Sequence, residues 1–333
     1  MSNTEEHPAE LLGECGSCPV DDAGHPVVEV LSAREVPLGG PRAMAVRRTL
    51  PQRQRSMVGA WCFADHYGPD DVSVTGGMMV PPHPHTGLQT VSWLFSGEIE
   101  HRDSGGVHAV VRPGELNLMT GGRGICHSEV STPATTILHG AQLWVALPDA
   151  ARDAPRDFQH YVPPAVEVDG AWVRVFLGAL AGQVSPVRTF TPLVGAEITV
   201  GPGARVELAV VPDFEHGLLA DSAELLLGDT ALARGELGYV GTGASTLAVH
   251  NPTGTAGRAL LLGGAPFDEE IVMWWNFVGR SHDEIVAFRA DWQRETERFG
   301  RVDGYRAGSS GIERLPAPVL PPVRIRPRGN RSQ

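Results

Sequence analysis

Residues 77–97 read GMMVPPHPHTGLQTVSWLFSG and contain two histidines, His83 and His85, one residue apart. In a β-strand, residues i and i+2 point to the same side, so both imidazoles can face one interior. Pro84 between them removes one backbone donor, which is tolerated at the start or at the edge of a strand. Two converging imidazoles are a natural beginning for a transition-metal site, but they need further ligands.

Residues 112–129 read RPGELNLMTGGRGICHSE and can supply those ligands. His127 and Glu129 repeat the i, i+2 spacing, and the intervening chain leaves room for a hairpin and a return strand across a barrel. Three imidazoles and one carboxylate leave positions open in a six-coordinate shell. That pattern suits Fe(II) better than a closed structural zinc site, and ligand softness leaves Mn, Co, Ni and Cu open. We therefore predict one metal on His83, His85, His127 and Glu129.

The wider sequence predicts an all-β protein with one helix. Between about residues 28 and 275, glycines and prolines punctuate short runs rich in Val, Leu, Ile and Thr, which is typical of a β-sandwich or barrel. Ser281 and Glu284 form a capping box, and Gly300 can end the helix that follows. Apolar residues near one face of this helix predict that it packs against the sheets.

Composition excludes several classes of protein. The net charge of −12 argues against direct nucleic-acid binding, which needs a basic face. All 27 basic residues are arginine, so enzymes that need a lysine, such as Schiff-base, pyridoxal-phosphate and P-loop enzymes, are excluded. No apolar run approaches the ~18 residues of a membrane span, and the N-terminus does not resemble a secretory signal. Four cysteines are too few for a disulfide scaffold, which favours a reducing cytoplasm.

Several motifs together resemble the pirin family of the cupin superfamily. They are HPHTG at 83–87, GEIEHRDS at 97–104, RPG at 112–114, MTGGRG at 119–124, HSE at 127–129 and HGAQLWV at 139–145. The similarity is specific over roughly residues 58–150. It implies a bicupin fold, that is, two tandem jelly-roll β-barrels with a C-terminal helix, and an iron site on the residues matching His83, His85, His127 and Glu129.

The resemblance and the sequence pattern together predict five segments. We expect a flexible N-terminal arm at 1–27, a metal-binding cupin domain at 28–175, a second cupin domain at 176–280, a packing helix at 281–300 and a Pro/Arg-rich tail at 301–333. His216 and His250 are isolated, so the second domain is expected to be metal-free. Cys15 and Cys18 have redox spacing but lie in the arm, where we expect an unstructured pair.

Two functions are compatible with this site. Pirins resemble flavonol (quercetin) dioxygenases, which implies oxygenation of a quercetin-like aromatic substrate, with Glu129 as ligand and proton acceptor. Met78, Met79, Trp93 and Met119 are candidates for an apolar lining. Some members are described as redox-sensitive regulators, so the alternative is a non-catalytic iron protein that regulates a protein partner. Gln89 stands where cupins usually place a glutamate. The missing carboxylate weakens the case for dioxygenase activity more than the case for metal binding.

The remaining histidines of this region are expected to be structural or to contact the ligands rather than the metal. They are His101, His108 and His139. Cys126, next to His127 in sequence, should point away from the ligands on a strand and pack in the core.

Overall fold

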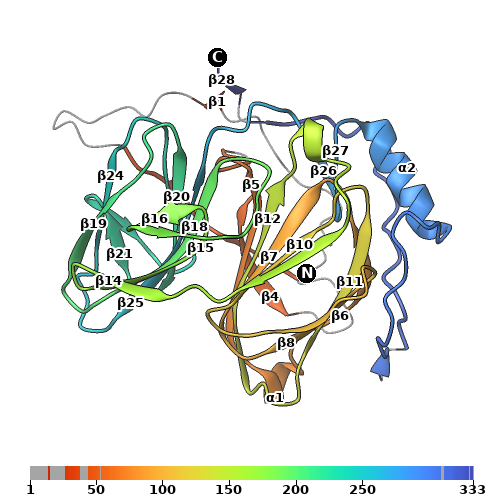
Figure 1. The fold of residues 1–333 in the computed structure, drawn as a ribbon, viewed down its shortest axis with the longest axis horizontal. Coiled ribbons are helices and arrows are strands. Elements are labelled where there is room, and N and C mark those ends of the chain that lie inside the picture. The colour runs from red at the N-terminus through yellow and green to blue at the C-terminus, as the bar shows by residue number, and fades with distance from the viewer. Residues whose placement is uncertain are drawn as a thin grey trace.

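The computed structural model describes residues 14–15, 27–37, 44–52, 54–308, 311–329 and 331–332. Figure 1 shows two β-rich domains side by side, with the helix α2 (His282–Gln293) on the outside of the first. Each domain consists of a seven-stranded and a four-stranded sheet. The sheets are not joined into a closed barrel, so each domain is a two-sheet jelly roll. The predicted all-β tandem arrangement is confirmed.

The first domain holds the predicted metal ligands. Its larger sheet has the spatial order β13 (Asp157–Tyr161), β10 (Leu116–Thr120), β7 (Leu88–Ser96), β12 (Ile137–Ala146), β5 (Trp61–Asp71), β4 (Ala45–Leu50) and β3 (Arg34–Pro37). Its smaller sheet has the order β6 (Met79–His85), β11 (Ile125–Ser131), β8 (Ile99–Asp103) and β9 (His108–Val111). Both predicted ligand pairs therefore lie on neighbouring strands of the smaller sheet.

The second domain repeats this plan. Its larger sheet has the order β14 (Ala165–Val168), β15 (Ala171–Leu177), β18 (Leu193–Val200), β25 (Gly257–Gly264), β20 (Glu215–Ser222), β23 (Leu237–Val240) and β2 (Glu29–Leu31). Its smaller sheet has the order β19 (Arg205–Ala209), β24 (Thr246–His250), β21 (Leu225–Leu227) and β22 (Thr230–Leu232). Buried Leu, Val, Ile and Ala side chains fill the space between the two sheets.

Short elements complete the described fold. They are the pairs β16 (Ala179–Leu180) with β17 (Gln183–Val184), β26 (Val272–Trp274) with β27 (Phe277–Gly279) and β1 (Glu14–Cys15) with β28 (Arg331–Ser332), together with α1 (Val72–Thr75) and a 3₁₀ turn at Asp149–Ala151. None of the helices in the described ranges is long and apolar enough to cross a membrane. Most of the predicted arm at 1–27, including Cys18, lies outside the described residues.

The chain changes from one domain to the other earlier than the expected position at 175. Strand β13 still pairs with β10 of the first domain, whereas β14 pairs with β15 of the second. Pro163 and Pro164 stand between them. Proline has no backbone donor and fixes its own φ, so two in succession end a strand. Residues 29–31, expected in the first domain, pair with β23 of the second.

Indole groups of the first domain contact the second domain directly. The Nε1 of Trp61 donates to the carbonyl oxygens of Val194 at 3.2 Å and Gly263 at 3.1 Å. Trp93 Nε1 donates to the Glu197 carboxylate at 2.8 Å. Trp93 therefore faces the other domain, and the prediction that it lines a substrate pocket was wrong. Alternation along β7 explains this, because Thr90 and Ser92 occupy the opposite face.

The helix α2 begins where the sequence predicted, and the tail that follows it contacts the first domain. The Ser281 hydroxyl accepts from the Glu284 amide at 3.2 Å, as predicted, but α2 ends at Gln293 rather than near 300. Glu295 has a φ of 54°, which a continuing α-helix does not allow. The described part of the tail consists mostly of turns, bends and irregular backbone. The amide of Leu315 donates to the carbonyl of Pro82 on β6 at 2.9 Å.

Candidate metal centre

Strand pairing brings three of the four predicted ligands together. Strands β6 and β11 run antiparallel with His127 opposite His83 and Ile125 opposite His85. The ring nitrogens of His83, His85 and His127 offer one ligand atom each, all within 4.8 Å of one another. All three side chains are buried between the two sheets of the first domain. The i, i+2 spacing in the sequence therefore gives the expected convergence.

Hydrogen bonds leave the ring nitrogens of two histidines available to a metal. The Nδ1 of His83 donates to the Pro81 carbonyl at 2.9 Å, and its Nε2 is buried without a protein partner. The Nε2 of His101 lies 3.1 Å from the Asp103 carboxylate, and its Nδ1 lies 3.4 Å from Nδ1 of His127. When His101 donates to Asp103, its Nδ1 can accept from His127, which leaves Nε2 of His127 unprotonated.

The protonation and spacing of the three imidazoles also suit a metal. Burial lowers the pKa of His83 to about 3 and lowers those of His85 and His127 well below the usual range. All three are therefore neutral at physiological pH, which metal binding requires. The Nε2 atoms of His85 and His127 lie 3.0 Å apart. Two nitrogens at ~2.1 Å from one ion and at right angles would be separated by about that distance.

Glu129 lies in the same interior but is not part of the group of three. Its carboxylate is fully buried, and the Ser92 hydroxyl lies 3.4 Å from its Oε1 and 3.0 Å from Oε1 of Gln142. The β-bulge between His127 and Glu129 shifts Glu129 opposite Val80. Gln89 alternates with Thr90 and Ser92 on β7 and so lies on the other face of that strand. There its amide nitrogen donates to the Thr120 hydroxyl at 3.0 Å, and its Oε1 is buried without a protein partner. Gln89 therefore does not replace a carboxylate ligand here.

The three other histidines have different surroundings. His101 contacts His127, as described above, while His108 is exposed and pairs with Glu100 at 2.8 Å. His139 lies at the boundary between the domains. The sequence did not distinguish these three residues as possible contacts of the predicted ligands. The structure does, because alternate residues of β8 are buried and His101 and Asp103 therefore face the interior. An alternating buried pattern in residues 99–103 is the signal that identifies His101.

The boundary between the domains contains a second buried cluster, which sequence reasoning missed. Asp221 of β20 accepts from Nε2 of His66 at 2.6 Å and of His139 at 2.5 Å through one oxygen. Its other oxygen accepts from Nε of Arg258 at 2.7 Å. Burial alone would raise the pKa of Asp221, but the bonds from His139 and His66 and the charge of Arg258 hold it well below its usual range.

This boundary cluster is arranged as a hydrogen-bonded ion pair. The Nε of Arg47 donates to Nδ1 of His66 at 3.1 Å, so His66 carries its proton on Nε2 and donates it to Asp221. The guanidinium groups of Arg47 and Arg258 place positive charge beside the carboxylate. A dication added there would meet strong repulsion, so the group links the domains rather than offering a cation site.

The isolated histidines of the second domain have no comparable surroundings. Both ring nitrogens of His216 are buried and lack a partner, and burial lowers its pKa to about 4. It lies on β20, next to the apolar side chains of that domain. His250 ends β24 and is only partly buried. The described residues of the second domain therefore offer two separate histidines instead of a converging set.

Comparison with known proteins agrees with this geometry. The pirin family model matches residues 43–145, and the model of the pirin C-terminal cupin domain matches residues 195–300. The chain belongs to the pirin family. The first match lies within the first jelly roll, and the second covers most of the second jelly roll and continues through β26, β27 and α2. The buried histidine cluster lies within the first matched region.

Similar proteins are known from several bacteria. The chain is 42% identical over 322 residues to a Pseudomonas aeruginosa protein provisionally named a quercetin 2,3-dioxygenase, covering 96% of this chain and 98% of that one. It is 34% identical to a pirin-like protein of Caulobacter vibrioides, covering 82% and 96% of the two chains. A crystal structure of quercetin 2,3-dioxygenase from Acinetobacter baumannii superposes with a TM-score of 0.84 at 38% identity, covering 90% of this chain and 97% of that one.

Proposed function

We propose that this pirin is a metal-dependent dioxygenase that acts on quercetin-like flavonols, with iron on His83, His85, His127 and Glu129. The observation that carries the proposal is the group of three buried, neutral imidazoles in the first domain. Similarity to proteins named quercetin dioxygenases supports the substrate class. A set of imidazoles with one carboxylate nearby matches the preferences of Fe(II).

The proposal gives each residue a defined task. When bound, the metal would supply a Lewis acid and a partner for dioxygen. His101 and Asp103 would hold the His127 ring so that its unprotonated Nε2 is free to bind the metal. The Glu129 carboxylate would accept the proton of the substrate's hydroxyl group. Ser92, within 3.4 Å of Oε1 of Glu129, would hold that carboxylate in place.

The side chains around the cluster would bind an aromatic substrate. Met119 is buried and stands opposite Thr90 and Phe158 on neighbouring strands, so these three share the face that the ligand cluster occupies. The Phe158 ring lies 4.9 Å from the His101 ring. An apolar wall of this kind excludes water from the reacting atoms and favours a flat ring system.

The test combines metal analysis with turnover. Protein loaded anaerobically with Fe(II) is mixed with quercetin and oxygen, and the loss of the flavonol absorbance is followed. We expect consumption by the wild-type protein, almost none by His85→Ala, and wild-type rates for His108→Ala, since His108 is exposed and pairs with Glu100. If the wild-type and His85→Ala proteins consume quercetin equally fast, the dioxygenase proposal is refuted.

A further inference from the structure

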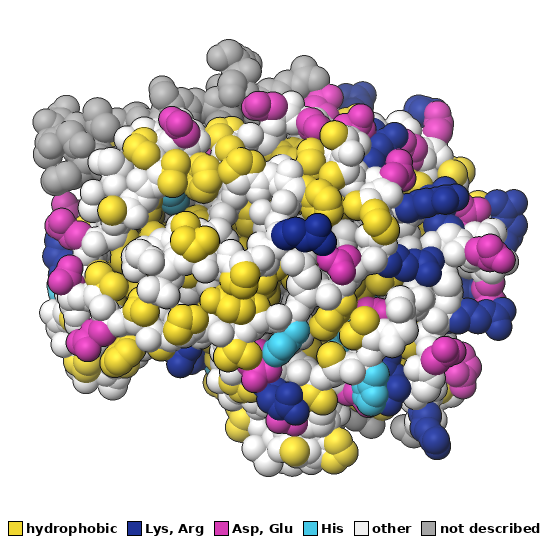
Figure 2. All heavy atoms as spheres, viewed as in Figure 1, with side chains coloured by type: hydrophobic (Ala, Val, Ile, Leu, Met, Phe, Trp, Pro, Cys, Tyr) yellow, Lys and Arg dark blue, Asp and Glu magenta, His cyan; other side chains and the backbone are white. Residues whose placement is uncertain are grey.

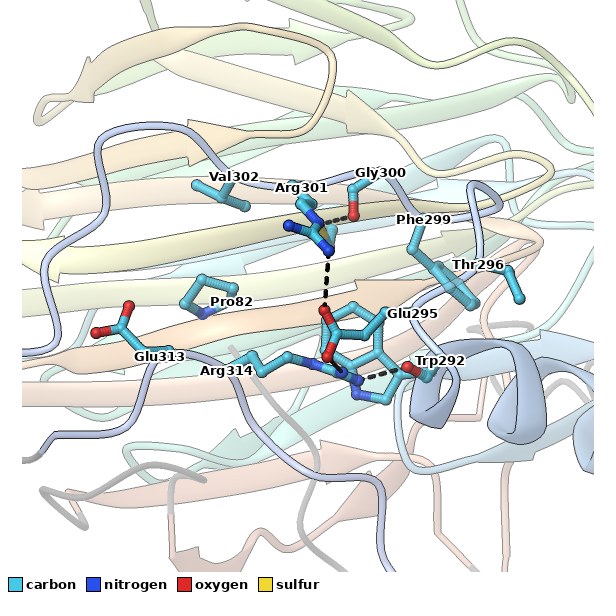
Figure 3. A pocket seen from close by; sticks show the side chains of 11 residues that line it. Pro82, Trp292, Glu295, Thr296, Phe299, Gly300, Arg301, Val302, Glu313 and Arg314 are labelled. Carbon is cyan, nitrogen blue, oxygen red and sulfur yellow. Dashed lines mark hydrogen bonds and ion pairs between the residues drawn. The ribbon is translucent and has the colours of Figure 1, made fainter.

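A cavity of about 230 Å³ lies outside the first domain, between its ligand-bearing strands and the C-terminal segment (Figure 3). Pro82 of β6 and Cys126 of β11 line it, together with residues from the end of α2 and beyond. Because side chains alternate along a strand, Pro82 and Cys126 lie on the opposite side from His83 and His127. The cavity is therefore separated from the metal centre by the strands themselves.

Aromatic rings form one corner of this cavity. The rings of Trp292 and Phe299 are perpendicular, with centroids 5.6 Å apart. The Nε1 of Trp292 donates to the carbonyl of Leu315 at 2.8 Å, which fixes the orientation of the indole. Val302 and Pro82 add apolar surface beside the rings. The two rings are only 4% and 1% exposed, and the Arg314 guanidinium lies over the Trp292 ring at 4.0 Å from its centroid. A flat hydrocarbon ring would therefore meet the edge of this corner together with Val302 and Pro82.

The polar part of the cavity wall has more donors than acceptors. Arg301 and Arg314 both pair with Glu295, at 3.5 Å and 3.1 Å, so two guanidinium groups share one carboxylate (Figure 3). Arg314 also donates from Nη2 to the carbonyl of Trp292, and its Nε is buried without a partner. The Thr296 hydroxyl is likewise buried without a partner, but Figure 3 shows Thr296 on the far side of Phe299 from the two arginines. Glu313 also lines the cavity, but Figure 3 shows its carboxylate directed away from these groups.

We propose that this cavity binds a single-ring aromatic carboxylate. The ring would pack against Val302, Pro82 and the exposed edge of the Trp292–Phe299 corner, and the carboxylate would accept from Arg301 and Arg314, since planar guanidinium groups match carboxylates well. The volume is below the ~300–1,000 Å³ of typical ligand pockets, which favours one ring over several. Figure 2 shows basic and acidic side chains gathered over this end of the molecule. The site is independent of the proposed dioxygenase activity.

The test is a calorimetric titration of benzoate into the full-length, metal-loaded protein. The Arg301 side chain is 83% exposed, so Arg301→Gln should keep the fold. We expect it to weaken benzoate binding by about tenfold, the effect of losing a charge-assisted hydrogen bond. Arg324→Gln is the matched control, because this arginine is 70% exposed, pairs with Asp283 and does not line the cavity. Benzamide, with the same ring but no charge, should bind more weakly than benzoate.

Two further variants separate this cavity from the metal centre. Val302→Trp should fill the cavity and abolish benzoate binding, whereas His85→Ala, which removes a metal ligand, should leave the affinity unchanged. Three results would each overturn the proposal. The first is that the wild-type protein does not bind benzoate. The second is that Arg301→Gln and Val302→Trp bind benzoate as tightly as the wild-type protein. The third is loss of binding in His85→Ala, which would place benzoate on the metal.

Discussion

Asp221→Asn tests whether the boundary cluster holds the two domains together. The carboxylate accepts from His66 and His139 of the first domain and from Arg258 of its own domain. Asparagine has nearly the same size and keeps one acceptor oxygen. It loses the negative charge, however, and it directs an amide nitrogen at one of the three donors. The variant therefore leaves a guanidinium group without its counter-ion and at least one donor unpaired.

The expected loss in the free energy of unfolding is about 3 kcal/mol. Breaking a buried ion pair by removing one partner costs about 3–5 kcal/mol. The Asp221 side chain is 1% exposed but that of Arg258 is 25% exposed, so water compensates part of the lost attraction. The remaining oxygen of asparagine can keep one imidazole donor. Both effects place the expected value at the lower end of the range.

Urea denaturation at neutral pH measures this loss, with tryptophan fluorescence and circular dichroism as two probes. If the cluster couples the domains, the two probes should also separate into distinct transitions in the variant. Asp229→Asn is the matched control, because Asp229 lies in an exposed turn, and it should change stability by less than about 0.5 kcal/mol. A midpoint for Asp221→Asn equal to that of the control would refute the reasoning.

Three further predictions follow from single side chains. The pKa of His216 is lowered to about 4, so the native state keeps this ring neutral while the unfolded chain takes up a proton below about pH 6.5. The free energy of unfolding is therefore unaffected by His216 above that pH and falls by about 3 kcal/mol as the pH drops to 4 and below. Denaturation curves of His216→Leu should consequently show a smaller acid sensitivity than those of the wild-type protein. Equal acid sensitivity of the two proteins would contradict this. Asp103→Asn should weaken metal affinity by about 10–100-fold in chelator competition, because Asp103 orients His101; unchanged affinity would remove that role. Ser281→Ala should cost about 1 kcal/mol in thermal denaturation by removing the cap of α2, and Ser245→Ala, on an exposed bend, is its control.

Local sequence patterns predicted the convergence of the three histidines and the all-β fold because both depend on short-range rules. The spacing of His83 and His85 fixes which side of a strand both occupy, whereas the β-bulge between His127 and Glu129 was not predictable from their spacing. Which strands become neighbours is a long-range property, but the separation of the two pairs along the chain already suggested a return strand. The start of α2 was predictable for the same reason, since a capping box is a local signal.

Features that depend on distant partners were not predictable. Trp93 looked like a pocket residue because a strand has two faces and the sequence does not say which one meets another domain. The link of Asp221 with His66 and His139 joins residues 155 and 82 positions apart. No pattern in the chain marks such a pairing in advance. The end of α2 was overestimated because residues 294–299 are compatible with a helix and only their contacts stop it.

The position of β2 has a consequence for dissecting this protein. Residues 29–31 complete the second domain's sheet beside β23, although most of that domain follows residue 164. A fragment that begins at residue 165 would therefore expose the backbone donors and acceptors along β23. Open edges of this kind recruit strands from other molecules. An isolated C-terminal half should consequently self-associate, and a peptide spanning residues 27–37, supplied separately, should suppress that association by filling the vacant edge.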